Sequence, residues 1–202
     1  MIGTYVGMFG TKKITFSIDK LVGDSLSGYS IVAANERAFA GTWKAFEGDA
    51  SYDLICKEPG DHPLDGVFTL SFNPYEKTLR GKWLANDRKK QKKAVPLELV
   101  ARVFSYDPKV GQFPEASTRL LKESDVKNLR QEELRIMRNE IYARHGYCFG
   151  LADMREHFDK QDWYMPVSVD IKTKLTKIEL ANEELIKRHE NYAAEYYDDF
   201  GR

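Results

Sequence analysis

The sequence predicts a segregated α+β protein: an antiparallel β-barrel or meander of about eight strands, followed by a small all-helical domain. Short segments of alternating polar and apolar residues, separated by turn residues, fill the first half. In the second half glycine is rare and apolar residues recur at helical spacing. Pro108, Gly111 and Pro114 mark the change. We expect a barrel- or lipocalin-like β domain over 1–104, a linker over 105–114 and a helical domain over 115–202.

The strands of the first half are predicted from their period-two patterns. Residues 14–19 and 68–72 alternate as half-buried strands do, and turn residues such as Pro59-Gly60-Asp61 lie between such runs. Eight strands with short hairpins can close into a barrel that has no exposed edge, and an open meander or a sandwich is the alternative. The expected strands are 4–9, 12–19, 26–33, 37–44, 50–58, 65–72, 77–84 and 94–102.

Four helices are predicted in the second half, over about 124–129, 131–145, 151–160 and 177–196. Leu134, Met137 and Ile141 place one apolar face on the second of these. Gly146 follows that helix at the position where glycine enters the left-handed region freely. Thr176 and Glu179 form a capping box at the start of the last helix.

One charged segment carries a family resemblance. Tyr142-Ala143-Arg144-His145-Gly146 lies within a polar helix, and Phe158, Trp163-Tyr164, Pro166 and residues 175–182 follow in order. Over about residues 115–192 this resembles the YARHG domain of bacterial surface proteins. The resemblance implies a small helical domain, an extracellular or periplasmic location and no catalytic activity.

The charged residues of this segment have two interpretations. In the favoured one they form a polar network that fixes how the helices pack, because buried polar groups must be satisfied. Glu140 would pair with Arg144 four residues on, and Asn139 and Asn182 would bond neighbouring helix ends. In the other, Arg138, Glu140, Arg144 and His145 line a ligand site. The residues assigned to the structural motif are Asn139, Tyr142, Gly146, Phe149, Trp163, Tyr164, Glu179 and Asn182.

The sequence indicates no metal or cofactor. His145, Cys148 and His157 match no four-ligand zinc pattern. Cys56 and Cys148 are expected to be buried thiols, and a disulfide between them is the alternative.

Composition bounds the partners and the location. The 31 basic and 31 acidic residues give a formal net charge of zero, which argues against nucleic-acid binding. No apolar run is long enough for a membrane span. The N-terminus has no signal-peptide pattern, which read literally predicts a cytoplasmic protein, although a mature or trimmed chain would look the same. The resemblance instead implies the periplasm or the extracellular surface. The basic run 88–93 is interpreted as a solvated loop, with contact to an anionic envelope polymer as the alternative.

The favoured function is therefore a non-catalytic, exported binding or adaptor module whose ligand is unknown, with an envelope polymer or envelope protein as the partner class. A small-ligand carrier that uses the barrel interior is the alternative, and a cell-wall-related enzyme is the weakest reading because no nucleophile, base and orienting group occur together. A carrier predicts a cavity of about 300 Å³ or more in the strand domain, whereas an adaptor predicts a filled barrel.

Overall fold

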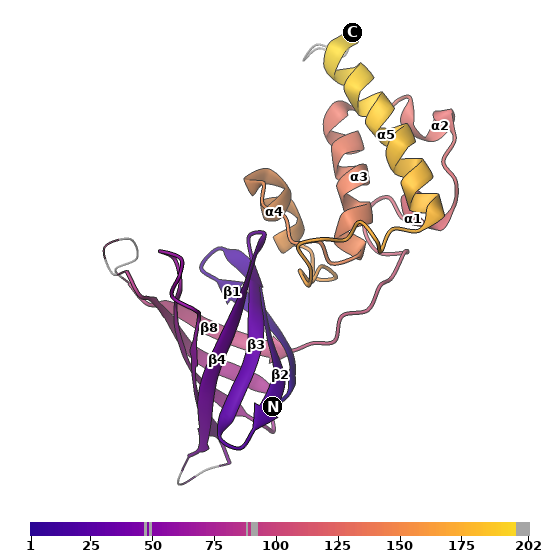
Figure 1. Cartoon of the computed structure of the whole chain (residues 1–202). Coiled ribbons are helices and arrows are strands. Elements are labelled where there is room, and N and C mark those ends of the chain that lie inside the picture. The colour runs from indigo at the N-terminus through magenta and orange to yellow at the C-terminus, as the bar shows by residue number, and fades with distance from the viewer. Residues whose placement is uncertain (47, 49, 88, 90–92, 197–202) are drawn as a thin grey trace. The chain divides into compact units, whose positions relative to one another are not determined.

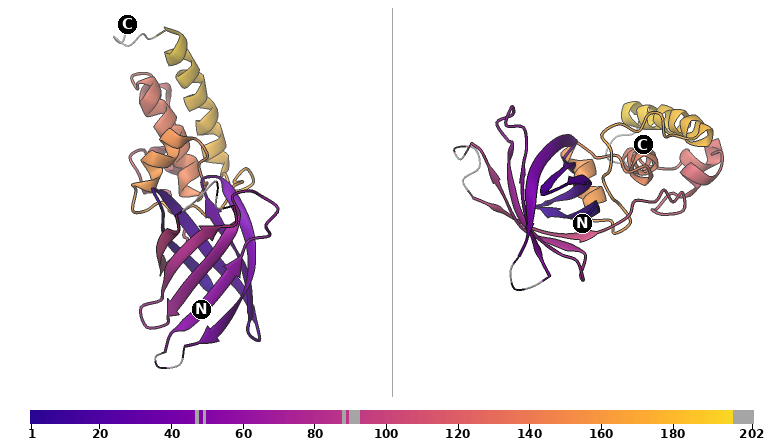
Figure 2. Two further views of the ribbon diagram at one scale, coloured as in Figure 1. Left: turned by 90° about the vertical axis from the view of Figure 1, so that its left-hand side faces the viewer. Right: turned by 60° about the horizontal axis from the view of Figure 1, so that its bottom comes forward.

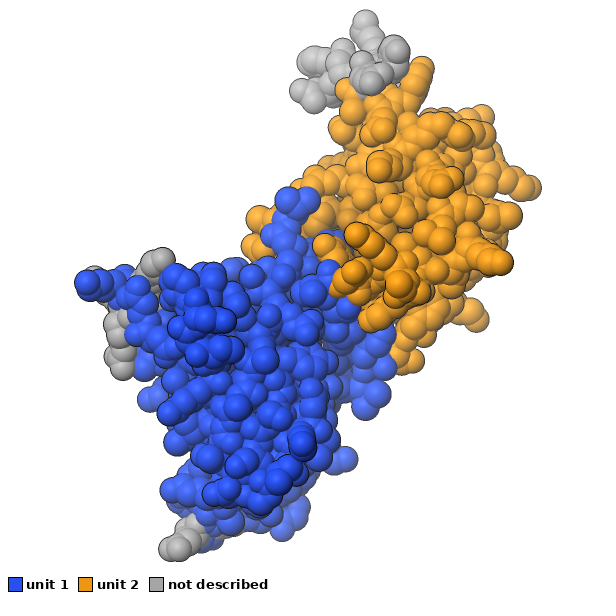
Figure 3. Space-filling model, viewed as in Figure 1, with its two compact units in different colours: residues 1–104, 148–151, 165–169 blue, residues 105–147, 152–164, 170–202 orange. Residues whose placement is uncertain are grey.

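The computed structural model describes residues 1–46, 48, 50–87, 89 and 93–196. It divides into two compact units (Figure 3). The first unit contains residues 1–104 together with 148–151 and 165–169, and the second contains residues 105–147, 152–164 and 170–202. Strands lie in the N-terminal part and helices in the C-terminal part (Figure 1), so the predicted segregation is confirmed.

The strands form a closed, up-and-down antiparallel barrel in which each strand pairs with its sequence neighbours. Pairing of the first strand with the last, for example Val6 with Val100, completes the barrel and leaves no open edge. The strands cross the barrel at a slant (Figure 2). They are β1 (Gly3–Phe9), β2 (Lys12–Val22), β3 (Ser25–Val32), β4 (Asn35–Ala45), β5 (Tyr52–Lys57), β6 (Gly66–Asn73), β7 (Thr78–Ala85) and β8 (Val95–Ala101).

The predicted strands match these eight, and the largest difference lies in β2. That strand runs to Val22 instead of residue 19 because its pairing with β3 shifts register between Ile18 and Lys20 and then continues. A bulge of this kind bends a strand without ending it. Gly28 lies where β2 and β3 approach closely, and a Cβ there would run into the carbonyl oxygen of Ser17. Bending the strand into the barrel wall therefore requires glycine at this position.

Aromatic side chains fill much of the barrel interior. Phe16 stacks on Phe39 with ring centroids 4.3 Å apart, and Phe68 meets Phe16 edge-on at 5.0 Å. Tyr5 and Phe72 make a further edge contact at 6.0 Å. These rings belong to one buried apolar cluster drawn from all eight strands. Its burial is the main stabilising term for this unit.

The second unit contains the helices. Described residues form α1 (Glu115–Thr118), α2 (Glu123–Val126), α3 (Gln131–Arg144), α4 (Ala152–Asp159) and α5 (Lys177–Tyr196). The predicted face of Leu134, Met137 and Ile141 is buried, and Ile186 of α5 packs in the same cluster. No helix among the described residues is both long and apolar enough to cross a membrane.

Both predicted helix-end signals of this unit are confirmed. Gly146 follows α3 with φ +74°, and its N–H donates to the carbonyl of Ala143. At the start of α5, the Thr176 hydroxyl accepts from the Glu179 N–H, and the Glu179 carboxylate accepts from the Thr176 N–H. These contacts satisfy backbone groups that the first and last turns of a helix leave without partners.

The two cysteines are buried and not disulfide-bonded, which confirms the expected thiols and rules out the alternative pairing. Burial raises the pKa of Cys56 to about 12. The Cys148 sulfur accepts a hydrogen bond from the Ala34 N–H at 3.1 Å. Of the basic run, residues 88 and 90–92 lie outside the described residues.

Candidate functional site

Arg144, the central arginine of the charged segment, is buried and bonded through three of its nitrogens. Its Nη2 lies 2.6 Å from Glu140 Oε2, which confirms the predicted pairing along α3. Its Nε donates to the Val110 carbonyl at 2.8 Å, and its Nη1 donates to the Ser117 hydroxyl at 3.0 Å. The Arg144 side chain has no exposed surface. Its contacts with Val110 and Ser117 link α3 to the segment before α1 and to α1 itself.

Glu140 supplies the negative charge that compensates the buried guanidinium of Arg144. Its carboxylate accepts from the backbone N–H groups of Gln112 and Phe113 at 2.7 and 2.8 Å, in addition to Arg144. A Cβ at Gly111, where φ is +94°, would lie 2.7 Å from the same carboxylate. A buried ion pair needs such additional hydrogen bonds to offset its desolvation.

His145 ends α3 and contacts the start of α5. Its Nε2 lies 2.8 Å from Glu179 Oε2, and the Tyr106 hydroxyl donates to Glu179 Oε1 at 3.1 Å. The Tyr106 ring stacks on the His145 ring with centroids 4.5 Å apart. Glu140, Arg144, His145, Glu179, Tyr106 and Ser117 are called the buried polar network below.

The electrostatics of this network favour a charged carboxylate at Glu179. Burial alone raises the pKa of Glu179, but hydrogen bonds from His145 and from the Thr176 amide outweigh it and lower the pKa to about 2. Burial and the neighbouring Glu179 charge raise the pKa of Tyr106 to about 12. Burial also lowers the pKa of Arg144. Glu179 is therefore an anion held by donors near neutral pH.

The two asparagines of the motif behave differently. Asn182 bonds the end of α1 as predicted: its Nδ2 donates to the carbonyls of Ala116 and Arg119, and its Oδ1 accepts from the Leu121 N–H. The corresponding prediction for Asn139 was wrong, because its Nδ2 donates to the Arg135 carbonyl one turn earlier in its own helix.

Arg138 and Tyr142 are partly buried and join α3 to α5. The Arg138 guanidinium contacts both carboxylate oxygens of Glu190, at 2.8 and 3.2 Å, and lies 6.0 Å from the centroid of the Tyr142 ring. The Tyr142 hydroxyl donates to Glu183 at 2.6 Å. Burial and Glu183 raise the pKa of Tyr142 to about 12.

The remaining motif residues are aromatic and serve as packing contacts. Tyr164 is buried, and its hydroxyl donates to the Tyr147 carbonyl at 2.6 Å. Trp163 meets both Tyr164 and Phe158 edge-on. Phe149 is buried within the first unit.

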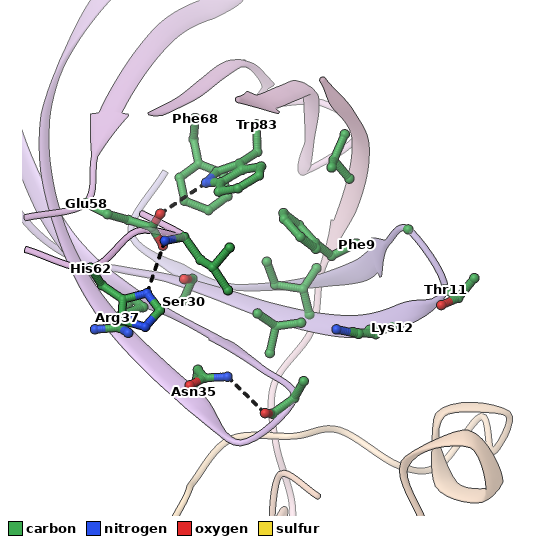
Figure 4. Close-up of a pocket in the computed structure, with 16 residues that line it drawn as sticks. Phe9, Thr11, Lys12, Ser30, Asn35, Arg37, Glu58, His62, Phe68 and Trp83 are labelled. Atoms are coloured by element: carbon green, nitrogen blue, oxygen red, sulfur yellow. Dashed lines mark hydrogen bonds between the residues drawn. The ribbon is translucent and has the colours of Figure 1, made fainter. Parts of the chain in front are cut away.

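A pocket of about 510 Å³ opens at one end of the barrel. It is called the barrel-mouth pocket, and every strand or the loop after it contributes to its wall (Figure 4). Its lining residues are Phe9, Gly10, Thr11, Lys12, Ile14, Ser30, Val32, Ala33, Asn35, Arg37, Glu58, His62, Leu64, Phe68, Trp83 and Val95.

Aromatic rings form one part of this wall and charged groups another. Phe9 meets Trp83 edge-on with centroids 5.1 Å apart, and Phe68 lies next to the same indole. Figure 4 shows Glu58, Arg37 and His62 on one side of the pocket and Phe9 and Lys12 on the other. The pocket thus combines an apolar wall with a few polar groups, as small-molecule sites do.

Glu58 is the buried acid of the pocket. Its Oε2 accepts from the Gly66 N–H at 2.7 Å and from the Trp83 indole N–H at 3.1 Å. Burial raises the pKa of Glu58, and these two hydrogen bonds oppose the shift. Nearby, Asp65 is fully buried and lies 3.6 Å from the Arg37 Nε. Among the described residues, Asp65 Oδ1 has no hydrogen-bond partner.

The charged segment and the barrel-mouth pocket share no residue. The sequence pointed to the residues of the first, whereas for the barrel it gave a cavity as an alternative without naming its lining. Glu58, Arg37 and Trp83 are far apart in the chain, and the consecutive pairing of β4 to β7 brings them together. Arg37 is in register with buried Ser30, and Trp83 with buried Phe68, whereas Glu58 lies in the loop after β5 and had no such signal. Among the described residues, no group of three or more His, Cys, Asp or Glu side chains is placed to hold a metal ion.

Comparison with known proteins identifies one part of the chain. The family model described as the YARHG domain matches residues 112–192. No curated protein and no solved structure matches the chain.

Proposed function

Because residues 112–192 form a YARHG domain, we propose that this chain is a non-catalytic binding module of the bacterial cell envelope whose ligand site is the barrel-mouth pocket. YARHG domains occur in extracellular and periplasmic proteins, and the family is not known to be catalytic. Ligand binding is assigned to the first unit, and no ligand site is assigned to the second unit.

The pocket is the observation that carries the proposal. Its volume of about 510 Å³ lies within the range of roughly 300–1,000 Å³ typical of small-molecule sites. The aromatic cluster fills the barrel below it, so the ligand would enter only the open end. This location supports the carrier interpretation in part, with the ligand at the mouth of the barrel instead of deep inside.

The buried polar network is assigned a structural role in the same proposal. Arg144 and Glu140 use their donors and acceptors on each other and on three backbone groups of the 110–113 segment. His145 and Arg138 each face a carboxylate of α5. Groups bonded in this way are poorly available to a ligand, because a ligand would first have to break these contacts.

A fluorescent apolar probe tests the proposal. N-phenyl-1-naphthylamine should bind the full chain with enhanced emission, and Val95→Trp should reduce this binding at least about tenfold because the indole fills the pocket. Ile55→Trp is the matched control, since Ile55 lies on β5, is 46 % exposed and does not line the pocket. Equal binding by the parent and both variants would disprove a ligand site at the barrel mouth.

A further inference from the structure

We infer that the barrel-mouth pocket selects small amphipathic ligands that carry a protonated amine, with Glu58 as the group that recognises it. The inference rests on the proposed function, since it names the ligand class of the same pocket. It follows from three features: an anchored acid, a neighbouring arginine that is paired with another carboxylate, and an aromatic wall.

Glu58 is oriented so that one oxygen is fixed and the other is available. The Gly66 and Trp83 donors both bond Oε2. Among the described residues no group donates to Oε1, and Glu58 lines the pocket, so Oε1 is the oxygen that a ligand would meet. The residue itself is only 9 % exposed. A buried carboxylate oxygen with an open face is a strong acceptor for a charged donor.

The surrounding charges leave this acid without a cation of its own. Arg37 and His62 lie on the same side as Glu58, and the Arg37 Nε faces Asp65 Oδ1, the buried oxygen that has no hydrogen bond among the described residues. Arg37 is thus paired with Asp65, which does not line the pocket, and among the described residues Glu58 itself has no salt bridge. Lys12 lines the opposite side at the β1–β2 turn and is only partly buried.

The aromatic wall accommodates the apolar body of such a ligand. Phe9, Phe68 and Trp83 present apolar surface for a hydrocarbon or ring body. The indole turns its N–H edge to Glu58 and holds that carboxylate in place. An ammonium group would therefore be bound by the carboxylate, while the hydrocarbon body packs against the rings.

Displacement of the fluorescent probe from the full chain tests the inference. Three competitors of equal chain length are compared near neutral pH: n-octylamine, n-octanol and octanoate. Octylamine should displace the probe at a concentration at least about tenfold lower than octanoate, as expected for a charge-assisted hydrogen bond. Glu58→Gln should abolish this preference while it keeps an acceptor for Trp83 and Gly66. Glu36→Gln, an exposed acid on β4, should retain the preference.

The outcomes separate the inference from the proposed function. Displacement by all three competitors at similar concentrations, or best by octanoate, would overturn amine selectivity while leaving the pocket as a binding site. Amine preference that survives in Glu58→Gln would remove Glu58 as its cause. If the probe bound Val95→Trp as it binds the parent, the binding site itself would be refuted, and the inference with it.

Discussion

At the scale of single residues, this chain places charged side chains inside the protein and gives each of them partners. Arg144 has no exposed side-chain surface, yet three of its nitrogens donate within the second unit. Glu179 accepts from a histidine, a tyrosine and a backbone amide. Removing one partner from such a set leaves a buried charge uncompensated. The loss of stability is then larger than the net contribution of the intact pair.

Glu179 makes the stability of the helical domain dependent on pH. The pKa of Glu179 is about 2 in the folded chain against an ordinary 4.5. The ionised carboxylate therefore contributes fully to the free energy of unfolding at pH values above the pKa of the unfolded chain, and this contribution is lost as pH falls from about 5 to about 2. The size of this contribution is on the order of 3 kcal/mol. Glu179→Gln should lower the free energy of unfolding by roughly this amount near neutral pH.

Urea unfolding followed by far-ultraviolet circular dichroism across this pH range measures the effect. The difference between the parent and Glu179→Gln should shrink as pH falls, because Glu179 itself becomes protonated in the parent. The other carboxylates titrate in both proteins, so their effects cancel in the difference. A difference that stays constant with pH would show that Glu179 carries no unusual pKa.

At the scale of helices and strands, the sequence predicted long periodic elements well and short ones poorly. The α5 helix has the predicted bounds, since its periodicity and capping box agree. The helix α1 was not predicted because its four residues are too few to show a period. The lining residues of the mouth pocket were not predicted, because they come from seven strands and the loops between strands and meet only when β1 pairs with β8.

The end of α3 gives the element-scale prediction. Gly146 has φ +74°, where a residue with a Cβ is disfavoured by about 1–2 kcal/mol, and a β-branched one by more. Gly146→Val should therefore lower the free energy of unfolding by about 2 kcal/mol or more, and Gly146→Asn by about half as much, since asparagine tolerates this region. Thermal and urea unfolding of both variants give the comparison, and equal stability of the valine variant and the parent would contradict the C-terminal cap.

At the scale of the whole molecule, stability and binding are assigned to different residues of the two units. The barrel presents a pocket with an apolar wall and one available acid, whereas the YARHG domain uses its charged motif for internal contacts. The sequence could predict the motif because its residues are contiguous along α3. The sequence alone could not decide whether the charged residues form a structural network or a ligand site. The answer depends on their partners, such as Val110 and Glu190, which lie well outside the motif in the chain.

Probe binding and unfolding free energy, measured together on Arg138→Ala and Val95→Trp, test this division most directly. Arg138→Ala removes the contact with Glu190, so it should lower stability by about 1 kcal/mol and leave probe binding unchanged. Val95→Trp should weaken binding and leave the unfolding of the helical domain unchanged. Lost binding with full stability in Arg138→Ala would contradict the account, because the charged motif would then be the ligand site.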